Sequence, residues 1–201
     1  MKYFTADTHF GHSNIIKFEN QPFRNQFKNI GEHDEFLINA WNSVVKYEDE
    51  IYILGDMFFG NIKNATWVIH QLRGRKYFIR GNHDKTTLQL QNKHNCFEWV
   101  KDMYELKVPD EEAPKKVQSI TLCHYAMIVW NKSHHGAWQL FGHSHGGLTG
   151  IREGHHNENK WTNMLSPNQF DVGYDVFQRP ISYEEVKAVI KNRNAKNNNK
   201  E

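Results

Sequence analysis

Short apolar segments followed at once by a metal-ligand-type residue recur along this chain, and this pattern constrains its fold more than any other feature. Residues 51–54 lead into Gly55-Asp56, residues 117–123 into His124, and residues 138–141 into Gly142-His143. Such runs are typical of buried β-strands. In open α/β architectures, sites lie on the loops at the carboxyl ends of the strands. We therefore expect an α/β protein in which several of these loops meet at one place.

Patterns typical of helices lie between the apolar runs. Apolar residues recur at helical spacing over residues 33–45, and Asn64 is placed to cap a second helix that stops at Gly74. Ser182 and Glu185 have the spacing of a capping box, which predicts a C-terminal helix. Helices packed on both faces of the sheets predict an α/β sandwich.

The chain length and its uneven composition predict the domain organisation. A chain of 201 residues is long enough for one domain with its own hydrophobic core, and no linker or internal repeat divides it. We expect this domain to span residues 1–190. Residues 191–201 are rich in asparagine and lysine and have almost no apolar side chain to bury, so we expect a disordered tail there.

Several classes of protein do not fit the composition. The longest apolar runs, such as residues 126–130, are too short to span a bilayer. The N-terminus has no signal-peptide pattern, so we expect a cytoplasmic protein. A net charge of +2 gives no basis for long-range attraction to duplex nucleic acid. We expect no membrane partner, and the sequence does not predict an oligomeric state.

The chain contains 13 histidines but only 2 cysteines, which favours a metal site built from imidazole and oxygen ligands. Residues two apart on an extended segment point the same way, so the two ends of a D-x-H or H-x-H motif can present ligands together. The candidate metal ligands, which lie in five short segments, are Asp7, His9, Asp56, Asn82, His124, His143 and His145. They exceed what one ion needs, whereas two ions that share a carboxylate would use them all.

Each segment also has an ordinary interpretation. Gly81-Asn82-His83-Asp84 has the composition of a turn, and His143 with His145 is consistent with a surface histidine pair. These interpretations fail jointly, because unrelated turns have no reason to fall in this order at successive strand ends. A closed structural zinc site would typically use cysteine thiolates, which the five segments do not offer as a set.

Taken in order, the motifs D-x-H, G-D, G-N-H-D, H and G-H-x-H resemble those of the calcineurin-like metallophosphoesterase superfamily, from Asp7 to His145. The resemblance implies a four-layer α/β/β/α sandwich with two mixed β-sheets. Residues 7–16 look like those of a compact, capless bacterial and phage branch, and residues 171–176 look like its closing strand. Carried over by motif, the resemblance implies one ion on Asp7, His9 and His145, another on Asn82, His124 and His143, and Asp56 bridging the two.

The same resemblance implies roles for residues around the ions. His83 is the expected general acid and phosphate contact, with Asp84 positioning it. Asn82 and His12 are expected to contact substrate as well. Arg24 has two interpretations, a phosphate contact or a structural ion-pair partner. Arg80 has the same two. His155 and His156 are expected to form a solvated loop pair, with the rim of the cleft as the alternative.

The sequence therefore predicts an enzyme, a binuclear metal-dependent phosphoesterase in which a hydroxide bridging the ions attacks phosphorus. A chain without a cap domain leaves the cleft open, which favours phosphodiesters, including nucleotide-type substrates, over phosphomonoesters. The alternative in another class is a protein-interaction scaffold with the same fold. Relatives of that kind lose the histidine after the motif asparagine, whereas His83 is present here. Nitrogen and oxygen ligands suit Mn²⁺, Fe, Co²⁺, Ni²⁺ or Zn²⁺, and we expect Mn²⁺ to support activity in vitro.

Overall fold

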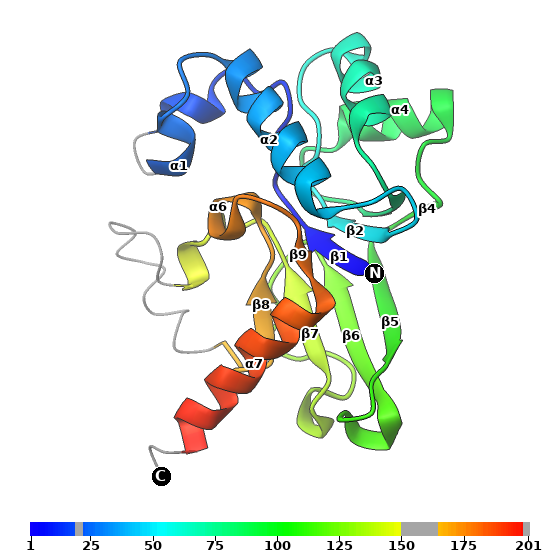
Figure 1. The fold of residues 1–201 in the computed structure, drawn as a ribbon, viewed down its shortest axis with the longest axis vertical. Coiled ribbons are helices and arrows are strands. Elements are labelled where there is room, and N and C mark those ends of the chain that lie inside the picture. The colour runs from blue at the N-terminus through cyan, green and yellow to red at the C-terminus, as the bar shows by residue number, and fades with distance from the viewer. Residues whose placement is uncertain (19–21, 150–164, 199–201) are drawn as a thin grey trace.

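The computed structural model describes residues 1–18, 22–149 and 165–198, which form an α/β fold around two mixed β-sheets (Figure 1). The first sheet has the strand order β4-β3-β2-β1-β9. Its strands are β1 (Lys2–Thr5), β2 (Glu50–Leu54), β3 (Arg75–Ile79), β4 (Trp99–Lys101) and β9 (Ile181–Ser182). The first four are parallel, and β9 runs antiparallel to β1. The predicted α/β class is therefore confirmed.

The second sheet has the order β5-β6-β7-β8. Its strands are β5 (Met103–Pro109), β6 (Val117–Cys123), β7 (Trp138–Phe141) and β8 (Gln169–Asp171). β5 pairs antiparallel with β6, while β6, β7 and β8 are parallel. Within each sheet the carboxyl ends of parallel strands lie at one edge, so the loops after β1 and β2 are neighbours, as are the loops after β6 and β7. The two sheets share a hydrophobic core, and this packing lets the two pairs of loops meet.

The described helices are α1 (Pro22–Asn25), α2 (Ile30–Val44), α3 (Ile62–Gln71), α4 (Lys85–His94), α6 (Tyr174–Phe177) and α7 (Tyr183–Asn198). The cap of α3 is Asn61, which accepts a hydrogen bond from the backbone N–H of Asn64, so the predicted helix starts earlier than expected. The predicted capping box before α7 is confirmed. The Glu185 carboxylate accepts from the Ser182 backbone N–H at 2.9 Å, and the Ser182 hydroxyl accepts from the Glu185 N–H at 3.3 Å.

Two hydrophobic cores lie on the two faces of the first sheet. On one face Ile51 and Ile53 of β2 pack with residues of α2, α3 and α4, including Leu37. On the other face Leu54 packs with residues of the second sheet, including Leu122. The alternation of side chains along β2 therefore joins a helical layer to one face and the second sheet to the other. Figure 1 shows α2, α3 and α4 gathered on one side of the molecule.

The structure differs from the prediction of a disordered tail beginning at residue 191, because α7 continues to Asn198. Its polar residues find partners on β8 and the preceding turn. The Arg193 guanidinium donates to the Gln169 carbonyl at 2.7 Å and lies over the Phe170 ring, and Asn194 donates to the Asn168 side chain at 2.9 Å. Residues 199–201 lie outside the described part of the chain.

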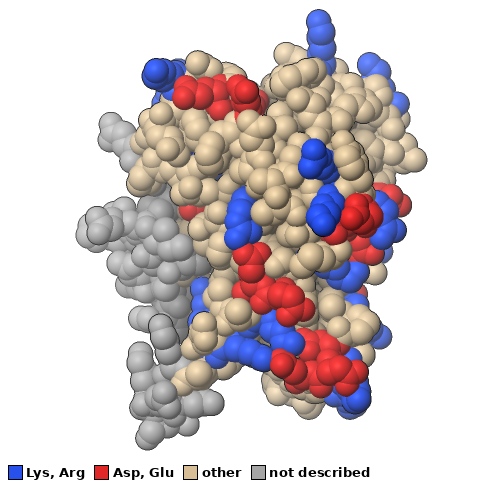
Figure 2. Space-filling model, viewed as in Figure 1, with Lys and Arg blue, Asp and Glu red and all other residues tan. Residues whose placement is uncertain are grey.

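Charged side chains also attach α7 to the second sheet. Lys187 pairs with Asp110 at 2.7 Å and with Glu112 at 2.9 Å. On the face drawn in Figure 2, acidic and basic side chains are interleaved rather than separated into patches of one sign. Among the described residues, no helix combines the length and hydrophobicity that a membrane span requires.

The segment expected to be a closing strand, residues 171–176, is only partly extended. β8 ends at Asp171, and Tyr174–Phe177 form the short helix α6. The Asp171 carboxylate explains the change of direction, because it accepts hydrogen bonds from the Gly173 N–H at 2.8 Å, the Gly146 N–H at 3.1 Å and the Ser144 hydroxyl at 2.5 Å. These bonds tie the end of β8 to the G-H-x-H loop.

Candidate metal centre

Left-handed backbone conformations distinguish most of the candidate ligands. A positive φ is uncommon for residues other than glycine and is strained unless the surrounding fold imposes it. The ligand residues with φ between 48° and 65° are Asp7, His9, Asp56, His143 and His145. Each lies in the loop that follows β1, β2 or β7, so the fold holds these five residues in an uncommon backbone conformation beyond the strand ends.

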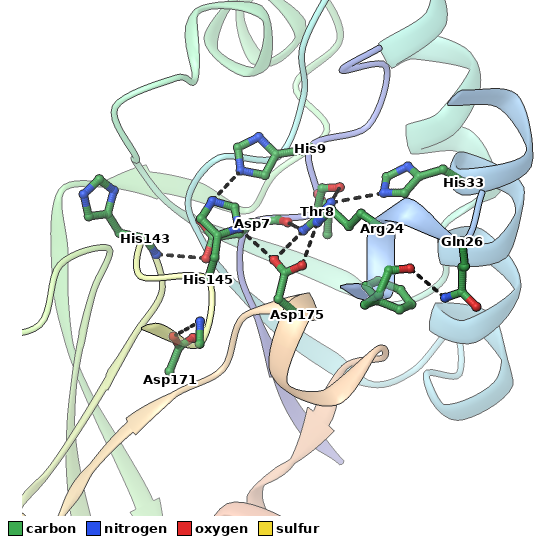
Figure 3. A network of polar contacts seen from close by, with 12 residues as sticks. Asp7, Thr8, His9, Arg24, Gln26, His33, His143, His145, Asp171 and Asp175 are labelled. Atoms are coloured by element: carbon green, nitrogen blue, oxygen red, sulfur yellow. Dashed lines mark hydrogen bonds and ion pairs between the residues drawn. The ribbon is translucent and has the colours of Figure 1, made fainter. Parts of the chain in front are cut away.

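Asp7, His9 and His145 form the first ligand group, in which one ligand atom of each lies within 4.8 Å of the others. The Nε2 atoms of His9 and His145 face each other at 3.3 Å (Figure 3). The Nδ1–H of His145 donates to Asp175 at 2.7 Å, so the Nε2 of neutral His145 presents a lone pair towards His9. Asp7 Oδ1 is buried and has no hydrogen-bond partner within the described chain. These atoms fit a cation.

Asp56, His124 and His143 form the second ligand group, again within 4.8 Å. The Nδ1–H of His124 donates to the Leu54 carbonyl at 2.7 Å, so its Nε2 presents a lone pair on the opposite side. That Nε2 faces the Asn82 side-chain oxygen at 3.0 Å and an Asp56 carboxylate oxygen at 3.6 Å. The Nε2 lone pair and the two oxygens are all hydrogen-bond acceptors. Either a proton on His124 Nε2 or a metal ion is therefore needed to bring them together.

The two ligand groups adjoin. The His143 backbone N–H donates to Asp7 Oδ2 at 2.8 Å (Figure 3), which joins a residue of the second group to a ligand of the first. Within the second group the His124 and His143 rings lie 5.1 Å apart. Glycine is required between the groups, because a Cβ at Gly142 would come within 2.6 Å of the same Asp7 oxygen. All seven predicted ligands therefore lie around one centre, which could hold two metal ions.

Burial controls the charge of the ligands. It raises the pKa of Asp7 to about 7 and lowers the pKa of His9 well below its usual value. Burial also works against a charged His124, but the adjacent Asp56 carboxylate and the negative charge of Asp7 outweigh it and raise the pKa of His124 to about 9. A divalent cation would take over the role of these protons, since metal ligands bind in their deprotonated forms.

The metal-free protein is expected to lose thermal stability as the pH rises from about 6.5 to 8. His124 is protonated below about 9 when folded but only below 6.5 when unfolded, so its stabilising contribution is complete below pH 6.5 and falls as the pH approaches 9. Asp7 acts in the same direction, because its folded-state pKa of about 7 lies above 3.8 and its bound proton is lost near pH 7. Thermal unfolding of chelator-treated protein at several pH values measures the fall.

Added Mn²⁺ should reduce this pH dependence, because the ion supplies the positive charge that the protons supply at lower pH. The comparison ends at pH 8, since burial lowers the pKa of Lys76 to about 8 and this residue adds the opposite dependence above that pH. Equal pH dependence with and without Mn²⁺ would contradict the metal assignment.

Asp175, which none of the motifs contains, supports the first ligand group. It lies on α6, is buried, and joins His145 to Arg24, with Oδ1 2.8 Å from Arg24 Nε (Figure 3). Burial would raise its pKa, but the positive charge of Arg24 and the bond to His145 hold the pKa well below its usual range. The sequence offers no signal for this role, since Asp175 follows the last motif by thirty residues.

Arg24 is structural, which resolves its two interpretations. The side chain is fully buried, and besides Asp175 it donates to the backbone carbonyls of Asp7 and Thr8. His33 is buried between Arg24 at 3.1 Å and Asp34 at 2.9 Å, and Figure 3 shows its contact with Arg24. Through the bonds from Arg24 to the Asp7 and Thr8 carbonyls, this buried network holds the backbone of the D-x-H loop in place. Arg80 instead pairs with the exposed Asp102 at the surface.

Replacing Asp175 with asparagine is expected to weaken Mn²⁺ binding about 10- to 100-fold, the usual cost of losing the partner that orients a metal-bound histidine. Isothermal titration of metal-free protein with Mn²⁺ measures the effect. Asp102→Asn is the matched control, because this carboxylate is exposed and pairs only with Arg80 among the contacts described. Unchanged affinity in a folded Asp175→Asn protein would show that the network has no part in binding.

The structure corrects the expected role of Asp84. Its carboxylate accepts backbone N–H groups of Asp56 at 2.9 Å, Met57 at 3.0 Å and Gly81 at 2.6 Å, together with the Thr87 hydroxyl at 2.8 Å. The four acceptor sites of the carboxylate are thereby used to join two motif loops. Asp84 positions Asp56 rather than the ring of His83.

His12, His83 and Phe59 lie along one side of the centre. His83 is exposed, and its ring lies 5.0 Å from that of Phe59 and 6.4 Å from that of His9. His12 stacks on Phe59 with ring centroids 4.1 Å apart and an interplanar angle of 8°. His83 and His12 are therefore placed near the ligands, as predicted for substrate contacts. Phe59 was not predicted, because a phenylalanine after an apolar run reads as core.

A cavity of about 510 Å³ lies away from this centre, and its lining includes Lys107, Val117 and Ala137. Val117 begins β6, whereas His124 follows its end, so the cavity is at the opposite end of that strand. It contains none of the candidate ligands. His155 and His156 lie outside the described residues.

Comparison with known proteins gives relatives along the whole chain. No model of a known protein family matches it. It is 28% identical to the gene 66 protein of Mycobacterium phage L5 over 204 residues, covering 92% of this chain and 91% of the phage protein. It is 24% identical to the gene 66 protein of Mycobacterium phage D29 over 209 residues, covering 94% of both.

An archaeal protein and a solved structure are also similar. The chain is 45% identical over 85 residues to the uncharacterized protein MJ1445 of Methanocaldococcus jannaschii, and the match spans 41% of this chain and 46% of that protein. The crystal structure of AQ665 from Aquifex aeolicus, a protein of unknown function, superposes with a TM-score of 0.65 at 25% identity, covering 94% of this chain and 98% of the other. The chain is thus similar in fold to the Aquifex aeolicus protein and similar in sequence to the phage proteins and the archaeal protein.

Proposed function

We propose that this chain is a binuclear metal-dependent phosphoesterase of the calcineurin-like type and that it prefers phosphodiesters. One observation carries the proposal: lone pairs and carboxylate oxygens from seven residues converge in two adjoining groups, and the described residues supply too few hydrogen-bond donors to satisfy them. Two divalent ions held there would lower the pKa of bound water and stabilise negative charge on phosphoryl oxygens.

The protein's own residues would do the remaining work. His83 is exposed beside the first ligand group, so its imidazole can reach the departing oxygen of an ester and donate a proton to it. Its backbone N–H donates to Asp56 Oδ1 at 2.8 Å, which fixes the histidine relative to a ligand. Asn82 and His143 are also exposed, which leaves the centre open on the second side and supports an extended substrate.

The finer features of the fold belong to the same proposal. We infer a four-layer α/β/β/α sandwich of the capless kind, on the resemblance of the five motifs. The described residues contribute one helical layer, two stacked sheets and α7, which contacts β8 and β9. A cytoplasmic location and Mn²⁺ as the ion that supports activity in vitro are also predictions made from the sequence, and they form part of this proposal.

Hydrolysis assays test the proposal. Protein freed of metal and resupplied with Mn²⁺ should hydrolyse bis-p-nitrophenyl phosphate faster than p-nitrophenyl phosphate, with no turnover before metal is added. An Asp56→Asn preparation purified in parallel reports any contaminating activity. Faster monoester hydrolysis would reverse the substrate preference. Failure of both esters with Mn²⁺, Fe²⁺, Co²⁺, Ni²⁺ and Zn²⁺ would contradict the enzyme assignment and favour the scaffold alternative.

A further inference from the structure

Two aromatic side chains that are not candidate ligands, the partly buried Phe59 and the exposed Tyr125, flank the metal centre. On one side, the Phe59 ring lies 5.0 Å from His9 and 5.0 Å from His83. On the other, the Tyr125 ring lies 4.8 Å from His143 and 4.9 Å from His124. Each ring therefore contacts a different ligand group, Phe59 the first and Tyr125 the second. Tyr125 is 46% exposed.

The Tyr125 segment is held in place by two glutamines that are buried on the outer face of the second sheet. Gln139 donates to the Tyr125 carbonyl at 3.1 Å, and Gln169 donates to the Met127 carbonyl at 2.6 Å. The two glutamines are bonded to each other at 2.9 Å. At the far end of the segment, the Trp130 indole donates to the Ala137 carbonyl at 3.0 Å.

This anchored segment carries apolar side chains into solvent. Ile128 and Val129, three and four positions after Tyr125 in the same loop, are 75% and 74% exposed. Clustered exposed apolar residues mark binding sites more often than isolated ones do. Since the backbone is already fixed, a group that packs on Tyr125 does not have to order the loop first.

Phe59 is also on a fixed backbone. Its N–H donates to the Phe10 carbonyl at 2.8 Å, and the next residue, Gly60, accepts from the Thr86 hydroxyl at 3.0 Å. His12 covers one face of the ring at 4.1 Å. The proposed proton donor His83 lies on this side, so the departing arm of a substrate would point towards Phe59.

We propose that Phe59 and Tyr125 determine specificity by packing against the two ester arms of a phosphodiester whose arms carry planar rings, aryl or nucleoside-type. The inference rests on the proposed function. A phosphorus atom between the ligand groups projects its two arms in different directions. The leaving arm lies on the His83 side against Phe59, and the retained arm lies against Tyr125. Planar rings are suited to both Phe59 and Tyr125, because every such ring has a π-face that stacks on an aromatic side chain.

Diesters that share one leaving arm test the assignment. The substrates are methyl, phenyl and thymidine 5′ esters of p-nitrophenyl phosphate, hydrolysed by the Mn²⁺-loaded full chain. Tyr125→Ala should raise KM about tenfold for the phenyl and thymidine esters, from the usual effect of losing one stacking residue. It should leave KM for the methyl ester and kcat for all three nearly unchanged, because the lost contact is the same in ground and transition states. Tyr125→Phe should restore the wild-type values.

Phe59→Ala should raise KM for all three esters alike, since all three share the p-nitrophenyl arm. Tyr47→Ala, at a 77% exposed tyrosine, is the control for general effects. Metal content of each variant separates lost stacking from lost ions. If the wild-type protein hydrolyses the diesters but Tyr125→Ala raises KM for the methyl ester as much as for the other two, the assignment of Phe59 and Tyr125 to the two arms is overturned. The proposed hydrolase activity is then unaffected. If no diester turns over with any of the metals, the proposed function fails and the assignment fails with it.

Discussion

Replacing Asp56 with asparagine is expected to lower kcat for bis-p-nitrophenyl phosphate by about 10³-fold or more and to reduce the bound metal from two ions to one. Losing several kcal/mol of transition-state charge stabilisation corresponds to a factor of this size. Asp56 is 2% exposed, and one of its oxygens lies 3.6 Å from His124 Nε2. Despite burial, the neighbouring His124 and the backbone N–H of His83 hold the pKa of Asp56 below the usual value, so it is an anion available to a metal.

Asparagine has nearly the same shape and keeps one acceptor oxygen, so the backbone bond from His83 to this side chain can persist. Metal content by elemental analysis and kcat from initial rates are the measurements. Asp102→Asn, which removes an exposed carboxylate whose partner is Arg80, is the control for a change in charge. Two tightly bound ions in a fully active Asp56→Asn protein would rule out the bridging role and with it the arrangement proposed for the centre.

Replacing His83 with asparagine is expected to have the second largest effect, and one that depends on the leaving group. Removing a general acid typically costs about 10²–10⁴-fold in rate when the departing alkoxide needs a proton. p-Nitrophenolate departs without one, so its esters should lose much less. The ratio of kcat for an alkyl-leaving diester to kcat for a p-nitrophenyl diester should therefore fall sharply in the variant.

His94→Asn is a matched control, because His94 is exposed on α4 and belongs to neither ligand group. Equal losses for both leaving groups would mean that His83 contacts the phosphoryl group without donating a proton. No loss for either would remove His83 from the reaction.

The ligands were predictable because their positions follow from local rules. Each ligand loop follows the carboxyl end of a predicted strand, and such loops carry the sites of open α/β architectures. That Asp56 after β2 and His124 after β6 come close also depends on the packing of the two sheets against each other, which the strand pattern alone does not determine. Asp175 was not predictable in this way. Its function depends on a contact with Arg24, 151 positions away in the chain, and both side chains are buried where no motif marks them.

Two of the differences from the sequence prediction, at Asp84 and in the tail, have the same origin. Asp84 stands next to His83, which suggested that the one positions the other, but its carboxylate turns back to the loop that begins at Asp56. The tail beyond residue 190 has too few apolar side chains to predict a packed helix. Arg193 and Asn194 nevertheless attach it to the second sheet by hydrogen bonds, and hydrophobic patterns carry no information about such bonds.

The left-handed backbone at five ligands has a consequence for how this chain can evolve. Each such residue costs about 1 kcal/mol or more relative to glycine in the same conformation. Replacement by glycine at Asp7, His9, Asp56, His143 or His145 would relieve that cost while deleting a ligand. In a lineage released from its chemistry, drift towards a more stable protein would therefore erase these positions early and leave the sheets intact.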